Sequence, residues 1–123
     1  MARILIIDDD NQFRVILRIM LENAGHKDIE AAENGYMGMK LIRNGHFDLV
    51  ITDIIMPEKE GIETIIEIRK DFPAIKIIAM SGGGKIGPDS YLEMADHLGA
   101  DRTLAKPFQQ SELVNAVQEL LKE

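Results

Sequence analysis

Short apolar runs alternate with longer amphipathic stretches along the chain. The runs are rich in Ile, Leu and Val, which favour strands buried on both faces of a parallel sheet. Strands are expected at Ile4–Ile7, Ile29–Ala31, Leu49–Thr52, Ile75–Met80 and Arg102–Ala105, the second of these being the weakest. The alternation itself is typical of βα units with helices on both faces of the sheet.

The stretches between the runs place apolar residues three or four positions apart, as on one face of a helix. The first helix is expected over about Asn11–Ala24, with Gly25 at its C-terminal cap. Further helices are expected to begin at Asn34-Gly35, at Gly61 and at Pro88-Asp89, the third of these closing at Gly99, and a last helix carries Leu113, Val117 and Leu121. Five strands and five helices indicate a single α/β domain over residues 1–123.

Composition narrows the classes of function. The chain has 123 residues, the size of one domain, and no cysteine, which excludes disulfides, thiolate metal sites and cysteine nucleophiles. A net charge of −7 disfavours direct binding of nucleic acid. No apolar run approaches the roughly 20 residues of a membrane span, and the first is too short for a secretory signal. We therefore expect a soluble, cytoplasmic protein with no membrane partner.

Polar residues follow four of the five expected strands. In chain order they are Asp8, Asp9 and Asp10, then Asp53, Ser81 and Lys106. In an open parallel sheet these strand ends meet at one edge, which is where ligands bind. Crowded carboxylates disfavour one another's ionised form unless a cation is present, and oxygen ligands without Cys or His favour Mg²⁺. The sequence therefore predicts a magnesium site at this edge.

Phosphoryl transfer fits these groups. With Mg²⁺ bound, Asp53 is a plausible nucleophile that forms an acyl phosphate, while Lys106 supplies positive charge and Ser81 a hydroxyl donor. Each residue taken singly has a simpler interpretation. Asp10 is more simply the N-terminal cap of the following helix, Ser81 a turn residue and Lys106 a surface charge. The combination favours the functional interpretation for all but Asp10.

Over essentially its whole length the chain resembles the receiver domains of two-component response regulators. The resemblance rests on Asp8-Asp9, on Asp53 followed by Met56-Pro57 and Gly61, on Ser81-Gly82 and on Lys106-Pro107-Phe108. It implies a flavodoxin-like, doubly wound parallel sheet of five strands in order 2-1-3-4-5 with five helices. It also implies a cis peptide bond between Lys106 and Pro107.

The resemblance further implies a function. Asp53 would be the phosphoacceptor, and Mg²⁺ would be held by Asp8, Asp9, Asp53 and the backbone carbonyl of Ile55, with Asp8 acting mainly through water. The donor would be a sensor histidine kinase or a histidine phosphotransfer protein, and phosphorylation would change binding to a downstream protein target. Phosphorylation and dephosphorylation would be self-catalysed, so we expect a signalling switch rather than an enzyme acting on small molecules.

Three positions matter when the chain is set against this family. One departs from the usual residue type, and two lie where the residue type influences the rate of hydrolysis. Thr103 stands where the family has an aromatic switch residue, so an inward-swinging ring cannot couple the site to the surface at that position. Ile55 and Gly83 stand where the family sets the rate of hydrolysis, and the bulk of Ile55 predicts a longer-lived acyl phosphate. The stretch Gly82–Pro88 is longer and richer in glycine than is typical.

Two other functions remain open at this point. A phosphatase of the haloacid dehalogenase type also uses an aspartyl phosphate, and its nucleophile would be Asp8. That pattern requires Thr or Val where this chain has Gln12. The other possibility is a docking module that works without phosphorylation, which the intact set of polar residues disfavours.

Overall fold

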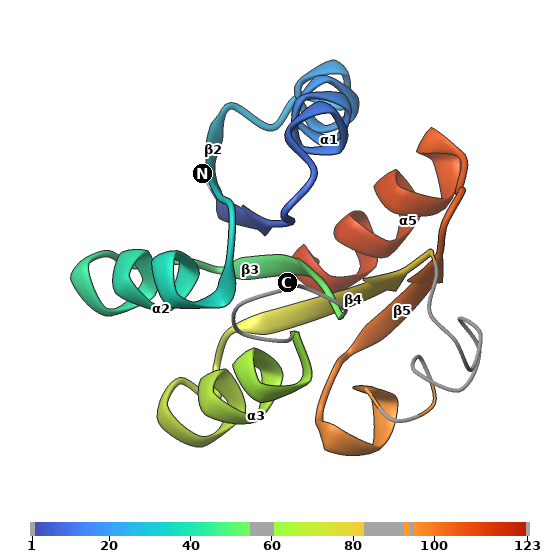
Figure 1. The fold of residues 1–123 in the computed structure, drawn as a ribbon. Coiled ribbons are helices and arrows are strands. Elements are labelled where there is room, and N and C mark those ends of the chain that lie inside the picture. Colours follow the sequence, from blue (N-terminus) through green and yellow to red (C-terminus); the bar gives the residue numbers. More distant parts are fainter. Residues whose placement is uncertain (1, 55–60, 83–92, 94, 123) are drawn as a thin grey trace.

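One parallel sheet organises the molecule. The computed structural model describes residues 2–54, 61–82, 93 and 95–122 (Figure 1). The strands are β1 (Arg3–Ile7), β2 (Asp28–Ala32), β3 (Leu49–Asp53), β4 (Lys76–Ser81) and β5 (Arg102–Ala105). They are all parallel and lie in the order β2-β1-β3-β4-β5, which confirms the predicted topology.

The helices begin and end close to where the sequence predicts. They are α1 (Asn11–Asn23), α2 (Gly35–Asn44), α3 (Gly61–Asp71) and α5 (Gln110–Leu121), and residue 93 and residues 95–98 are also helical. The predicted start of this fourth helix at Pro88 lies outside the described residues, but its predicted end agrees, because Gly99 follows it with a φ of +119°. Within the described ranges, no helix has the length and apolarity needed to cross a membrane.

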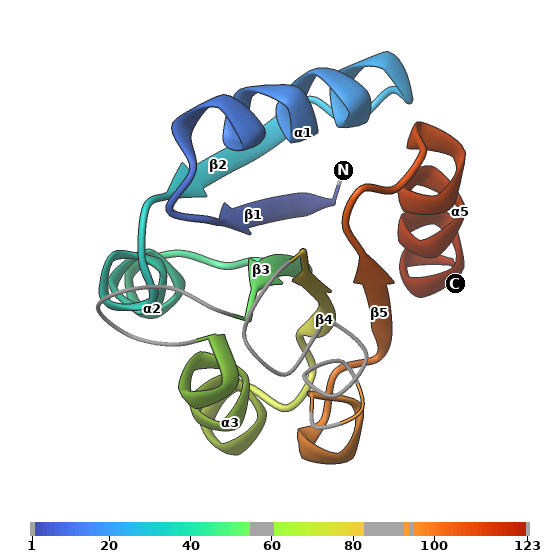
Figure 2. The ribbon, with the colours of Figure 1, turned by 45° about the vertical axis from the view of Figure 1, so that its right-hand side comes forward.

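The strands are buried on both faces because their side chains alternate between two helical layers. Ile4 and Ile6 pack with Leu17 of α1 and Val117 of α5. The intervening residues of β1 pack in a second cluster, with α2 and α3. Figures 1 and 2 show α1 and α5 on one side of the sheet and α2 and α3 on the other. Each fully buried Ile or Leu contributes about 1.5–3 kcal/mol by leaving water.

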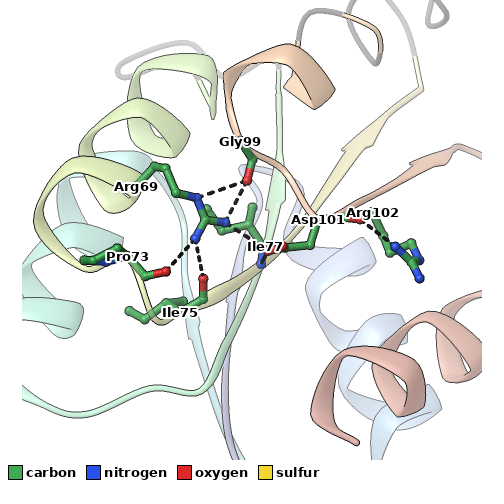
Figure 3. A network of polar contacts seen from close by, with 7 residues as sticks. All are labelled: Arg69, Pro73, Ile75, Ile77, Gly99, Asp101 and Arg102. Carbon is green, nitrogen blue, oxygen red and sulfur yellow. Dashed lines mark hydrogen bonds and ion pairs between the residues drawn. The ribbon is translucent and has the colours of Figure 1, made fainter.

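The guanidinium of Arg69 cross-links the segments at the amino-terminal edge of the sheet by hydrogen bonds (Figure 3). Arg69, near the end of α3, donates hydrogen bonds to the carbonyl oxygens of Pro73 (2.9 Å), Ile75 (3.0 Å) and Gly99 (2.7 Å) and to Asp101 Oδ2 (2.9 Å). Asp101 Oδ2 also accepts from the backbone N–H of Ile77 at 2.8 Å. We call Arg69 and Asp101 the amino-edge clamp, because they join α3, β4 and β5.

Candidate functional site

The opposite edge of the sheet gathers the polar residues singled out from the sequence. Asp8 directly follows β1, and Lys106 directly follows β5. Asp53 and Ser81 are the last residues of β3 and β4, so each of these strands extends one residue further than predicted. Because β1, β3, β4 and β5 are consecutive in the sheet, all four residues lie at its carboxyl edge.

Three carboxylates meet at this edge. Asp8, Asp9 and Asp53 each contribute an oxygen, and these oxygens all lie within 4.8 Å of one another. Asp8 is fully buried and Asp53 is 7% exposed, whereas Asp9 is open to solvent. Such a set of hard oxygen donors, reachable from water on one side, suits a divalent cation such as Mg²⁺. Asp10 instead caps α1, as predicted, by accepting from the N–H groups of Gln12 and Phe13.

The buried charge of Asp8 is well compensated. Its Oδ1 accepts from the backbone N–H of Asp10 at 2.9 Å, and its Oδ2 accepts from Lys106 Nζ at 2.8 Å. Its backbone carbonyl accepts from Arg14 Nη1 at 2.6 Å. Both carboxylate oxygens of Asp8 therefore have a donor already, and the side chain is held in one orientation.

The negative charge of Asp53 is compensated much less than that of Asp8. Lys106 Nζ lies 3.5 Å from its Oδ2, beyond the distance of a good hydrogen bond. Burial, and then the charges of Asp8 and Asp9, raise the pKa of Asp53 to about 6, against the lowering effect of Lys106 and of the Ile54 N–H. At neutral pH the side chain is mostly ionised in surroundings that disfavour the charge. A cation at this position would stabilise it.

Ser81 carries a buried hydroxyl in an unusual state. The residue is fully buried, yet its Oγ has no hydrogen-bond partner among the described residues. Buried polar groups in proteins are nearly always paired, so an unpaired one at a carboxylate cluster points to a ligand that supplies the partner. A phosphoryl oxygen or a bound water is such an acceptor.

Two glycines next to the site are required by close packing. A Cβ at Gly82 would lie 2.7 Å from Cβ of Lys106, so any side chain there would displace the lysine. A Cβ at Gly61 would overlap the backbone carbonyl of Asp53. The Gly61 N–H donates to the carbonyl of Ile54 at 2.8 Å and thereby holds the backbone after Asp53.

Some features implied by the resemblance lie among the described residues, and others lie outside them. The Lys106–Pro107 peptide bond is cis, as the resemblance implies. Thr103 pairs with Ala79 in the register of β4 and β5 and is half-buried. Ile55, Met56-Pro57 and Gly83 lie outside the described residues, as does most of the glycine-rich stretch.

One neighbour of the site was not singled out from the sequence. The ring of Phe13 lies 4.1 Å, centroid to Nζ, from the ammonium of Lys106. From the sequence, Phe13 is expected only to lie in the first helix, over about Asn11–Ala24. A signal was available, because Asp10 caps that helix and its first turn must therefore lie beside Asp8 and Asp9.

The chain is similar to known proteins of one family. It matches the family model of the response regulator receiver domain over residues 4–118. It is 34% identical over 123 residues to the response regulator receiver protein CpdR of Brucella abortus, covering 98% of each chain. It is 35% identical over 124 residues to a homolog of the transcriptional regulatory protein CpxR from Haemophilus influenzae, and spans only about half (51%) of that relative.

A solved structure has the same fold. The response regulator TrrA of Thermotoga maritima, crystallised in complex with Mg(2+)-BeF, superposes with a TM-score of 0.84 at 36% identity, covering 98% of this chain and 100% of that one. The residues matched by the family model, 4–118, cover all five strands of the flavodoxin-like sheet except Arg3, and they include the acidic carboxyl edge. From these likenesses and its own geometry, the chain belongs to the response regulator receiver domain family.

Proposed function

We propose that this chain is a phosphorylation switch in which Asp53 accepts a phosphoryl group with the help of Mg²⁺. The donor is the phosphohistidine of a sensor histidine kinase or of a histidine phosphotransfer protein. Phosphorylation changes the affinity for a downstream protein in the cytoplasm. The observation that carries the proposal is the meeting of three carboxylates within 4.8 Å beside Lys106.

The residues present fit a magnesium ion, but they would not all contact it in the same way. Asp9 and Asp53 would hold the ion directly, together with the backbone carbonyl of Ile55, which the family resemblance contributes and which lies outside the described residues. Asp8 would act mainly through water, as the family resemblance implies, and each of its oxygens already accepts one hydrogen bond. When bound, Mg²⁺ offsets negative charge on the attacking and transferred oxygens.

The chain's own residues perform the transfer by position and charge. A carboxylate oxygen of Asp53 attacks phosphorus, so that an O–P bond forms as the P–N bond of the donor breaks and the electron pair returns to the imidazole. Lys106 places its ammonium beside the attacking carboxylate. The unpaired hydroxyl of Ser81 gains an acceptor in the transferred group. Water later hydrolyses the acyl phosphate and restores the Asp53 carboxylate, which resets the switch. We expect a signalling switch rather than an enzyme acting on small molecules.

The geometry favours Asp53 over Asp8 as the nucleophile. Asp8 is fully buried and both of its oxygens are engaged, whereas Asp53 is partly accessible and only weakly paired with Lys106. A free oxygen lone pair is what attack on phosphorus needs. This contrast argues against the phosphatase alternative, in which Asp8 would attack phosphorus, the alcohol would leave, and water would then hydrolyse the Asp8 acyl phosphate.

The surface beside the carboxyl edge offers room for a protein donor. Val15, Ile16 and Ile19 of α1 are 50%, 44% and 50% exposed. They lie within about three helical turns of Asp9, so a protein donor that brings a phosphohistidine to Asp53 can contact them. Charged substitution at Ile19 should slow transfer from a protein donor and leave phosphorylation by a small molecule unchanged.

A mass measurement tests the proposal. The protein is incubated with acetyl phosphate or phosphoramidate and Mg²⁺, and its intact mass should rise by about 80 Da, the mass of a phosphoryl group. The adduct should be absent from Asp53→Asn and present in the matched control Asp10→Asn. Steady hydrolysis of phosphomonoesters that depends on Asp8 would instead support the phosphatase. Absence of any adduct in the wild-type protein would contradict the proposal and favour a docking module.

A further inference from the structure

The ammonium of Lys106 has neighbours of two kinds. On one side are carboxylate oxygens, with Asp8 Oδ2 at 2.8 Å and Asp53 Oδ2 at 3.5 Å. On another side is the ring of Phe13, whose centroid lies 4.1 Å from Nζ. The face of an aromatic ring carries negative potential, so it attracts a cation within about 6 Å.

The ring of Phe13 is itself held from two directions. Phe13 is in the first turn of α1, and its backbone N–H donates to Asp10 Oδ1 at 3.2 Å. Phe108 meets the same ring edge to face, with centroids 5.8 Å apart and an interplanar angle of 84°. Both rings also pack against the core cluster beneath α1 and α5. The orientation of the ring is therefore fixed before any ligand arrives.

A lysine needs such support at this position. Its four-carbon stem is flexible and its ammonium is a point charge without a preferred plane. Gly82 allows the stem to pass close to the end of β4, but a glycine offers the stem no side-chain contact. A ring face attracts the ammonium without accepting through a lone pair. The N–H groups of Lys106 therefore remain available for oxygen atoms at the site.

We propose that Phe13 is a positioning residue for phosphoryl transfer, because its ring face holds the Lys106 ammonium between Asp8 and Asp53. This inference rests on the proposed function and adds a residue to it. The ring does not touch the reacting atoms. It acts through Lys106 by limiting where the charge lies when the phosphoryl group arrives.

A graded change of the ring separates attraction from packing. Phenylalanine with one, two or three ring fluorines is inserted at position 13, which weakens the negative face while nearly preserving the shape. The initial rate of phosphorylation by acetyl phosphate with Mg²⁺ should fall stepwise, by about three- to tenfold across the series. Phe47 supplies the matched control, since its ring lies 4.6 Å from the Arg3 guanidinium, which is not a residue of the site. Fluorination there should leave the rate unchanged.

A second readout does not depend on phosphorylation. In the wild-type protein without phosphodonor, the ring current of Phe13 should shift the NMR signals of the Lys106 side-chain protons nearest Nζ. The shift should disappear in Phe13→Leu and persist in Phe13→Tyr, which keeps the ring, and the Tyr variant should also keep the wild-type rate. Thermal unfolding identifies variants that are not folded.

The two readouts distinguish the possible failures. If the wild-type protein is phosphorylated but fluorination at position 13 leaves the rate unchanged, the positioning role is wrong and the switch stands. If the wild-type protein forms no adduct although the ring-current shift is present, the proposed function fails first and the positioning role fails with it. If the shift is absent, the contact itself does not hold the lysine and the inference is overturned.

Discussion

The two edges of the sheet carry charged networks that differ in how completely they are satisfied. In the amino-edge clamp, the Arg69 guanidinium has four acceptors within 3.0 Å, and the Asp101 carboxylate has two donors on one oxygen (Figure 3). At the carboxyl edge three carboxylates meet, and among the described residues the Lys106 ammonium lies 2.8 Å from one of them and 3.5 Å from another, while a buried hydroxyl lacks a described partner. The charges of the clamp are paired with one another, whereas among the described residues the carboxyl edge leaves the Asp53 charge poorly compensated and the Ser81 hydroxyl without a partner.

This difference in charge compensation indicates that the clamp residues stabilise the fold, whereas Asp53 and Ser81 are suited to bind a ligand. Functional sites commonly retain groups that lower stability, because the same groups are needed for chemistry. Substitutions that remove polar groups should therefore lower stability at the clamp, whereas substitutions of Asp53 or Ser81 at the carboxyl edge should leave stability unchanged or raise it.

Arg69→Ala should lower the free energy of unfolding by about 2–4 kcal/mol. The substitution leaves the partly buried Asp101 carboxylate without its cation and removes the donors to three carbonyl oxygens. Urea denaturation measures the change. Arg102→Ala is the matched control, because Arg102 pairs with Glu119 on the surface and its loss should cost less than about 1 kcal/mol. Equal costs for the two variants would show that the clamp has no special role in stability.

Asp53→Asn should raise the free energy of unfolding by about 1–3 kcal/mol at pH 8. The pKa of Asp53 is about 6 in the folded chain and 3.8 for the free side chain, so folding favours the protonated form. The stability from this preference is present below about pH 4 and is lost as the pH rises through about 6. The gain from asparagine should therefore vanish at low pH.

Asp101→Asn is the control for this second prediction. It should lose stability at pH 8, because its oxygen pairs with Arg69 and accepts from the Ile77 N–H. The account would be contradicted if Asp53→Asn lowered stability at pH 8, or if the two variants behaved alike across the pH range.

Ser81→Ala should change the free energy of unfolding by no more than about 1 kcal/mol, and toward greater stability. The hydroxyl that it removes has no described partner, so no hydrogen bond is lost. Thr52→Val is the matched control, since the equally buried Thr52 hydroxyl donates to the Asp53 carbonyl at 3.0 Å and its loss should cost about 1 kcal/mol. Thermal unfolding that shows Ser81→Ala to be the more damaging of the two would refute this prediction.

Much of the fold could be predicted because its signals are local. The apolar runs, the N-terminal cap Asp10 and Gly25, which follows the C-terminal cap Ala24, predicted the bounds of the elements to within a residue or two. The signal for β2 was weak because Ile29 is the one large apolar residue in that strand. The strand order came from the family resemblance, since runs of Ile and Val do not specify which strands are neighbours.

The gathering of polar residues at one edge of the sheet could be predicted, but the balance of charge among them could not. The strand-end positions of Asp8, Asp53 and Lys106 are visible in the sequence. That Lys106 binds Asp8 more closely than Asp53, and that burial raises the pKa of Asp53, depends on three-dimensional packing. The same is true of Phe13, whose ring lies beside a residue far away in sequence.

The most direct test of the incomplete carboxyl edge is the titration of Asp53 by carbon-13 NMR, with and without magnesium. We expect a pKa of about 6 in metal-free protein, and a marked decrease when Mg²⁺ is added, because the cation compensates the carboxylate. An Asp53 pKa already in the ordinary range without the metal, or one that Mg²⁺ leaves unchanged, would contradict the account.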